Sequence, residues 1–172
     1  FSIGSKDSAY QFGASGAFAV HVSGKDSEGT VLVEAYDLLT QSGARLTNVS
    51  ARNFAGTGSD TFIAGFVISG TEAHRVLIRA VGPTLGNYGV SGFLEDPTLT
   101  IFNSANEVVL KNDNWSPELS SVFQSVGAFG FTDASRDAAI IAELPPGAYT
   151  VQVLGVNNGV GEALVEVYEI ID

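Results

Sequence analysis

Gly161-Glu-Ala-Leu-Val-Glu-Val-Tyr-Glu-Ile170 is a stretch of alternating side chains near the C-terminus, and Gly29-Thr-Val-Leu-Val-Glu-Ala-Tyr-Asp-Leu38 repeats it near the N-terminus. A period of two residues places one set of side chains in a core and the other in solvent, which is typical of a β-strand. Both stretches therefore predict strands. Their similarity in Gly, Glu and Tyr, in register, predicts an internal repeat.

The same alternation recurs along the chain, separated by turn residues such as Gly, Asn, Asp and Pro. One helical turn is expected at 117–123, because Ser116 can cap it and Pro117 suits a first helical position. Many short strands predict an all-β protein, an antiparallel jelly-roll-like β-sandwich. The predicted strands are 17–22, 30–36, 61–68, 75–81, 97–102, 107–110, 138–142, 148–153 and 163–168.

The repeat extends over more than one strand. Residues 1–9 match 131–139, and Gly16-Ala-Phe-Ala-Val-His-Val22 matches Gly147-Ala-Tyr-Thr-Val-Gln-Val153, at a nearly constant offset of about 130 residues. A complete unit is therefore expected at 44–172, whereas residues 1–40 repeat only its last third. Because three strands with one apolar face are not stable alone, we expect this partial repeat to add strands to the complete unit or to be completed by another chain.

Charge and composition exclude several classes of function. The net charge of −11 argues against binding to nucleic acid or anionic lipid. The chain has no Cys, and no apolar run approaches the length of a membrane span. It also has no Met, so Phe1 is either a processed N-terminus or the start of a fragment. We interpret the chain as an extracellular or cell-surface part of a bacterial protein whose signal peptide has been removed.

Two segments resemble a known family. Pro97-Thr-Leu-Thr-Ile-Phe-Asn-Ser-Ala-Asn-Glu-Val-Val-Leu-Lys-Asn-Asp-Asn-Trp115 and Leu144-Pro-Pro-Gly-Ala-Tyr-Thr-Val-Gln-Val153 resemble the bacterial pre-peptidase C-terminal domain over roughly residues 75–170. This resemblance implies a jelly-roll sandwich, often appended to secreted enzymes and sometimes calcium-binding, without catalysis of its own. Arg45–Arg52 and Val76–Pro83 are similar to a repeat of large secreted proteins of environmental bacteria, which implies no activity.

One oxygen-rich turn is the candidate metal site. Asn112, Asp113 and Asn114 supply side-chain oxygens of the kind that calcium prefers, and Asp137 is expected to add a carboxylate. The spacing is not that of an EF-hand loop. The alternative is a polar turn whose side chains bind their own backbone. Calcium is thus the one candidate cofactor, and no other cofactor is expected.

No catalytic residue is predicted. Serines are numerous, but no Gly-x-Ser-x-Gly motif accompanies His21 or His74, the two histidines. Glu34 and Glu166 occupy the same position in the two copies, which indicates an architectural role such as facing Arg79 across a sheet. Trp115 is expected at a corner of the core, with a sugar-stacking platform as the alternative.

Two functions follow as hypotheses. The first is a noncatalytic structural subunit of an extracellular filament, sheath or surface assembly, a homo-oligomer or homopolymer that self-associates through strand edges. The second is an accessory module of a larger secreted repetitive protein, binding calcium or polysaccharide. Asn48 and Asn114 also begin sequences that match the glycosylation signal. The residues expected at subunit contacts in the first case are Phe1, Ile3, Tyr10, Phe12 and Phe18.

Overall fold

The computed structural model of the chain describes residues 5–11, 13, 16–25, 29, 31–36 and 46–171. By its internal contacts the chain divides into two units, Phe1–Leu38 and Leu39–Asp172. The first unit is called the N-terminal segment.

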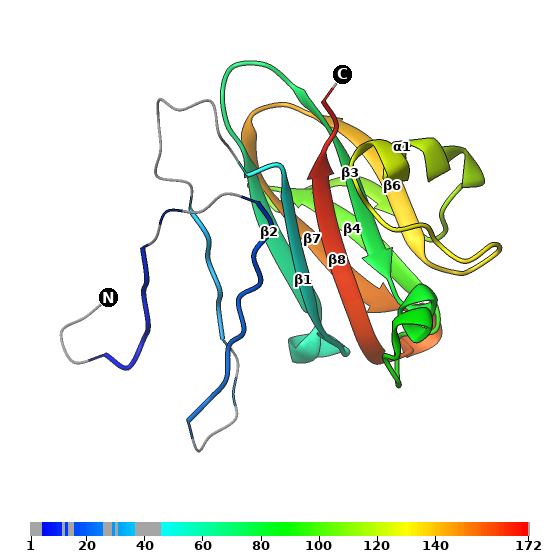
Figure 1. Cartoon of the computed structure of the whole chain (residues 1–172), viewed down its shortest axis with the longest axis horizontal. Coiled ribbons are helices and arrows are strands. Elements are labelled where there is room, and N and C mark those ends of the chain that lie inside the picture. The colour runs from blue at the N-terminus through cyan, green and yellow to red at the C-terminus, as the bar shows by residue number, and fades with distance from the viewer. Residues whose placement is uncertain are drawn as a thin grey trace. The chain divides into compact units, whose positions relative to one another are not determined.

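The second unit is a sandwich of two antiparallel four-stranded sheets (Figure 1). One sheet has the order β1-β8-β3-β6 and the other has the order β2-β7-β4-β5. The first strand thus pairs with the last and the second with the seventh, as in a jelly roll, and the predicted fold class is confirmed. The strands are β1 (Asn48–Ala55), β2 (Phe62–Ile68), β3 (His74–Val81), β4 (Pro97–Asn103), β5 (Val108–Asn112), β6 (Ala138–Leu144), β7 (Gly147–Gly155) and β8 (Gly161–Glu169).

Every strand predicted from residue 61 onward is confirmed, with bounds that differ by a few residues. Strand β1 was not predicted from its sequence pattern. It is an edge strand in which only Ala55 is buried, so its side chains follow no apolar alternation. Short helical turns connect the strands, including the predicted turn after Ser116, whose Oγ accepts a hydrogen bond from the Glu118 amide at 3.4 Å. They are η1 (Gly58–Asp60), η2 (Pro83–Tyr88), η3 (Pro117–Leu119), α1 (Ser120–Ser125) and η4 (Val156–Asn158).

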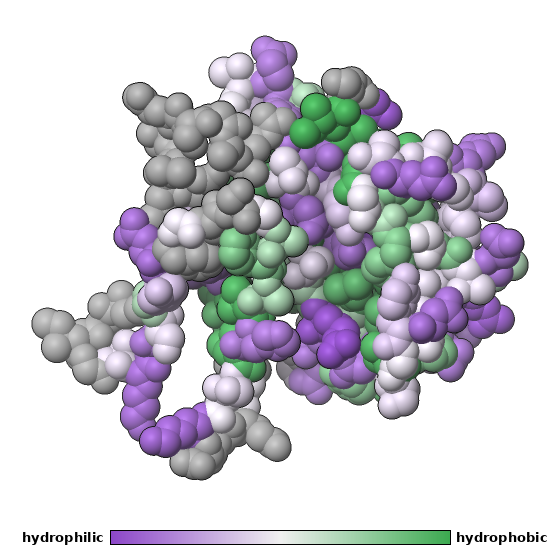
Figure 2. Space-filling model, viewed as in Figure 1, coloured by the Kyte–Doolittle hydropathy of each residue, from purple (hydrophilic) through white to green (hydrophobic). Residues whose placement is uncertain are grey.

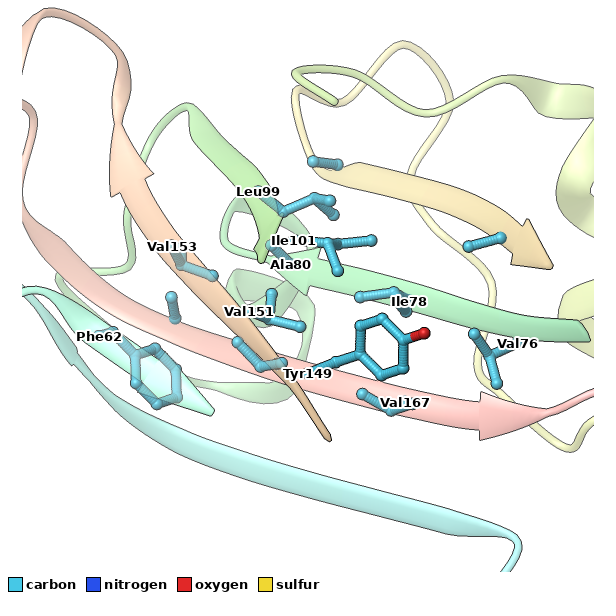
Figure 3. Packing of buried hydrophobic residues seen from close by; sticks show 14 of the residues in the cluster. Phe62, Val76, Ile78, Ala80, Leu99, Ile101, Tyr149, Val151, Val153 and Val167 are labelled. Carbon is cyan, nitrogen blue, oxygen red and sulfur yellow. The ribbon is translucent and has the colours of Figure 1, made fainter. Parts of the chain in front are cut away.

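The main core lies between the two sheets (Figure 3). Alternate residues of β3 and β8, such as Ile78 and Val165, face alternate residues of β4 and β7, such as Ile101 and Val151. Each buried side chain of this size contributes roughly 1.5–3 kcal/mol, so the strand alternation read from the sequence supplies most of the driving force.

A second apolar cluster lies on the outer face of the β1-β8-β3-β6 sheet. Leu77, Val81, Ala139 and Tyr168 belong to it, and they come from the positions that alternate with the main core. Aromatic residues between Trp115 and Phe131, around η3 and α1, cover them. This second layer makes both faces of β3 buried, and it creates the closed site described below.

The surface of the sandwich carries scattered hydrophilic side chains between smaller hydrophobic areas on the side that Figure 2 shows. None of the helices among the described residues has the length and hydrophobicity that crossing a membrane requires.

The N-terminal segment has no strand among its described residues. This corrects the expectation that the partial repeat adds strands at 17–22 and 30–36. The sandwich supplies the reason, because its last three strands do not pair with one another: β6 and β8 both border β3, and β7 borders β2 and β4. A copy of these three strands alone lacks the neighbouring strands with which they form backbone hydrogen bonds in the complete unit.

Candidate functional site

A buried ion pair joins β3 to β8. Arg79 lies directly opposite Glu166 in the strand register, and its Nε atom is 3.1 Å from Glu166 Oε2. Both side chains are buried, and Arg79 is 0% exposed. The pairing of these two residues, expected from the sequence, is confirmed. It follows from the alternation of each strand, which turns both side chains to the outer face of the sheet.

Three aromatic rings surround the guanidinium. The Arg79 Cζ atom lies 4.6 Å from the ring centroid of Phe123, 4.4 Å from that of Phe129 and 4.2 Å from that of Phe131. Arg79 Nη1 also donates a 2.7 Å hydrogen bond to the Phe129 carbonyl. A guanidinium is weakly hydrated and favours ring faces, so this environment offsets part of its desolvation cost.

Tyr168 completes the group, which we call the Arg79 cluster: Arg79, Glu166, Tyr168, Phe123, Phe129 and Phe131. The Tyr168 hydroxyl donates to Glu166 Oε1 at 2.6 Å. Burial raises the pKa of the Glu166 carboxyl, and the Arg79 guanidinium opposes that rise. Burial lowers the pKa of Arg79 in the same way, with Glu166 opposing. The pKa of Tyr168 is raised by burial and by its bond to Glu166.

The Arg79 cluster is closed to a substrate. Within the described residues, Arg79 Nε and Nη2 and Glu166 Oε2 make no hydrogen bond of good geometry, so Nε and Oε2 interact as charges in contact. A catalytic or binding carboxylate has to face a ligand, whereas Glu166 faces an arginine packed among phenylalanines. The arrangement can fix the register of β8 on β3 and hold the 123–131 segment against the sheet.

The four candidate calcium ligands are divided between two sets of hydrogen bonds. Asp137 is 0% exposed, and its carboxylate accepts from the Gly82 amide at 2.7 Å, the Ser135 hydroxyl at 2.6 Å, and the amide and hydroxyl of Thr84. Asn112 Oδ1 accepts from the Ala139 amide at 3.1 Å. These bonds tie the β3–β4 connection and the end of β5 to the start of β6.

The other two candidate ligands lie at the surface. Asn114 Nδ2 donates to Asp113 Oδ2 at 3.4 Å, and both residues are exposed. A calcium ion shared by all four residues would have to displace the bonds that Asp137 and Asn112 already make. The bonds of Asp137 and Asn112 reach other segments of the chain and not the backbone of their own turn, so they do not confirm the polar-turn alternative, and calcium binding stays a prediction.

The candidate contact residues lie in the N-terminal segment. Phe1, Ile3 and Phe12 are outside the described residues. Tyr10 is 88% exposed and Phe18 is 58% exposed. Val20 and Val33 are also exposed, although Val151 and Val153 of β7 and Val165 of β8, which follow the same repeat, are core residues.

The remaining polar and aromatic candidates have structural contacts. His74 Nδ1 lies 2.7 Å from Glu169 Oε1, which joins β3 to the end of β8. Trp115 packs edge-on against Phe131 at 5.5 Å between centroids, so its expected place at a core corner is confirmed. A small pocket of 190 Å³ lies between α1 and the ends of β1 and β8, and this volume is below the roughly 300 Å³ of typical ligand sites.

Sequence reasoning did not find the aromatic surroundings of Arg79. The signal was present in the density of Phe residues at 123, 129 and 131, beside a single short helix. It also did not find that Asp137 binds the β3–β4 connection, because that contact joins residues more than fifty positions apart.

The order of the strands in the two sheets defines this protein as a jelly-roll β-sandwich domain. One solved structure that it resembles is the pre-peptidase C-terminal domain of a collagenase from Bacillus anthracis. The two share 16% sequence identity with a TM-score of 0.43, and the alignment covers 70% of this chain and 88% of that chain. No protein-family profile matches the sequence. No curated protein matches it either.

Proposed function

We propose that this chain is a noncatalytic structural module of an extracellular assembly, and that strand contacts made by its N-terminal segment join it to neighbouring subunits. The observation that carries the proposal is a difference between the two copies of the repeat. Val20 is 69% exposed, whereas its counterpart Val151 is 0% exposed in the core of the sandwich. The same apolar pattern is thus buried once and left at the surface once.

The strand edges of the sandwich offer a second contact. Within the described residues β1 pairs with β8 on one side, and its burial pattern is exposed at every position before Ala55. Its sequence carries a single charged residue, Arg52. Exposed edges with few charges pair readily with another strand, and head-to-tail pairing of this kind generates filaments.

Sedimentation of the purified chain over a range of concentrations tests the proposal. We expect concentration-dependent oligomers, and we expect Val20→Asp to abolish them. Val160→Asp is the matched control, because Val160 is also exposed, at 52%, but lies in the connection before β8 and not on an edge strand. A wild-type chain that stays monomeric would contradict the proposal, as would a Val20→Asp variant that assembles like the wild type.

The second candidate is an accessory module of a larger secreted repetitive protein. The repeat itself favours it, since units that recur at an offset of about 130 residues fit a tandem array. In this case the N-terminal segment belongs to a neighbouring unit of the same polypeptide. Binding of polysaccharide is a proposal that goes with this candidate, whereas the bonds that Asp137 and Asn112 already accept argue against calcium at the 112–114 turn.

A further inference from the structure

In the complete unit, the back part (131–172) is held by specific residues of the front part (44–130). Arg79 of β3 meets Glu166 and, through it, Tyr168 of β8. At the start of β8, Gly161 lies against the backbone of Phe93 and Leu94, where an added Cβ would approach Leu94 N to 2.6 Å. The Leu94 amide also donates to the Glu162 carbonyl at 2.8 Å. Glycine is therefore required at this position.

The N-terminal segment repeats these features of the back part. Gly29, Glu34 and Tyr36 correspond to Gly161, Glu166 and Tyr168. Tyr36 donates to Glu34 Oε1 at 2.9 Å, as Tyr168 donates to Glu166. At Gly29, however, a Cβ would meet nothing within 4 Å, and Glu34 and Tyr36 are exposed. The N-terminal segment thus repeats the back-part residues of two contacts. In the complete unit, the residues on the other side of both contacts belong to the front part.

We infer that the N-terminal segment docks onto the front strands of another jelly-roll unit, and that Glu34 receives an arginine from the β3-type strand of that unit. The inference rests on the second candidate function, the tandem array, and identifies what the N-terminal segment binds. The charge of Glu34 and the open space at Gly29 both favour a front part with an arginine as the partner. The Glu34 carboxylate matches a guanidinium, and Gly29 leaves room for a backbone like that of Phe93 and Leu94.

A front part whose β3-type strand is already covered by a β8-type strand cannot receive the segment. In the complete unit Arg79 is paired with Glu166, so docking of the segment there would release β8. The partner is therefore a front part whose β3-type strand is open.

Fusion of a second copy of residues 44–130 ahead of residue 1 of the full chain tests this inference. The added front part should fold with the N-terminal segment into a second jelly roll. We expect amide hydrogen exchange at residues 31–36 to slow by about 100-fold or more relative to the unfused chain, as for backbone entering a stable sheet.

Charge variants of the fusion test the role of the arginine. Arg79→Met in the added copy and Glu34→Gln should each remove most of that protection, and the combination of Arg79→Met with Glu34→Leu should restore it, because an apolar pair replaces a buried ion pair well. The same substitutions at Arg79 and Glu166 of the original unit serve as the matched control. Their effects should be of the same sign and size.

The outcomes separate the inference from the proposed function. Protection that survives both single charge variants would overturn the role of Glu34 and leave strand docking in place. A fusion whose residues 31–36 exchange as fast as in the unfused chain would overturn the inference. The proposed function is judged independently by the oligomerisation of the unfused chain and its Val20→Asp variant.

Discussion

Arg79 stands directly opposite Glu166 between β3 and β8, with both side chains buried on the same face of the sheet. Removal of one partner leaves an uncompensated buried charge, so Arg79→Met or Glu166→Leu should each lower the free energy of unfolding by about 3–5 kcal/mol. The double variant Arg79→Met with Glu166→Leu should be close to the wild type. Urea unfolding of the four proteins forms a complete cycle, and a double variant as unstable as the singles would contradict this account.

The Tyr168 hydroxyl should ionise only at very alkaline pH. Burial and its bond to Glu166 raise its pKa above the ordinary value of 10.0. A group with a raised pKa stabilises the folded state below its unfolded pKa, and this stabilisation is lost as the pH rises above about 10. The pKa of Tyr36 is also raised, by its hydrogen bond to Glu34. Tyrosinate absorbance of the folded protein should therefore show a late titration step that becomes smaller by one tyrosine in Tyr168→Phe. An unchanged late step in that variant would assign it to another residue.

Asp137→Asn should destabilise the sandwich although the side chain keeps its size. The carboxylate accepts from backbone amides and hydroxyls of Gly82, Thr84 and Ser135, and an amide nitrogen in its place would face some of these donors. Loss of buried hydrogen bonds to a charged acceptor should cost about 2–4 kcal/mol. The control is Asp113→Asn at the exposed turn, for which thermal unfolding should show almost no change.

Calcium should leave the stability of the chain unchanged. Asp137 and Asn112 already use their oxygens as acceptors of protein hydrogen bonds, so a shared ion gains few ligands at this turn. We expect equal Tm values in excess EDTA and in excess calcium. A Tm that rises with calcium and no longer does so in Asp113→Asn would establish the predicted metal site instead.

The two equivalent glycines should differ in their tolerance of a side chain. Gly161→Ala places a Cβ against the backbone of Phe93 and Leu94 and should lower the free energy of unfolding by about 3 kcal/mol. Gly29→Ala should have no effect on the stability of this chain, since open space surrounds that position. Chemical denaturation compares them. In the fusion described above, Gly29→Ala should become as costly as Gly161→Ala.

The sequence predicted the strands that carry an alternating core and did not predict β1. In β3, Ile78 and Ala80 alternate with Leu77 and Arg79, and both sets become buried because a second layer covers the outer face. Strand β1 lies at an edge and is exposed at every position before Ala55, so its sequence shows no alternation of apolar and polar residues. The contact of Glu166 with Arg79 could be expected because Glu recurs at the same position in both copies of the repeat. The phenylalanines that enclose Arg79 come from a connection without periodicity, so the sequence pattern did not predict them.

The partial repeat was predicted as a set of strands, and the reason that it forms none among the described residues is topological. Alternation in Val31, Val33 and neighbouring positions reports which side of a strand would be buried. It does not report which strand lies alongside. In a jelly roll the neighbours of β8 are β1 and β3, so the pattern alone could not supply the ladder.

The pairing of β1 with β8 determines how the unit responds to tension. Asn48, where the chain enters β1, is the partner of Tyr168, one residue before β8 ends. The two chain ends of the unit therefore leave from the same end of one ladder. Tension applied to these two ends breaks the hydrogen bonds between β1 and β8 one after another. It does not load all of them at once, as shear along the strands would. A row of such units would lengthen at low force, and would behave as an extensible tether rather than a stiff rod.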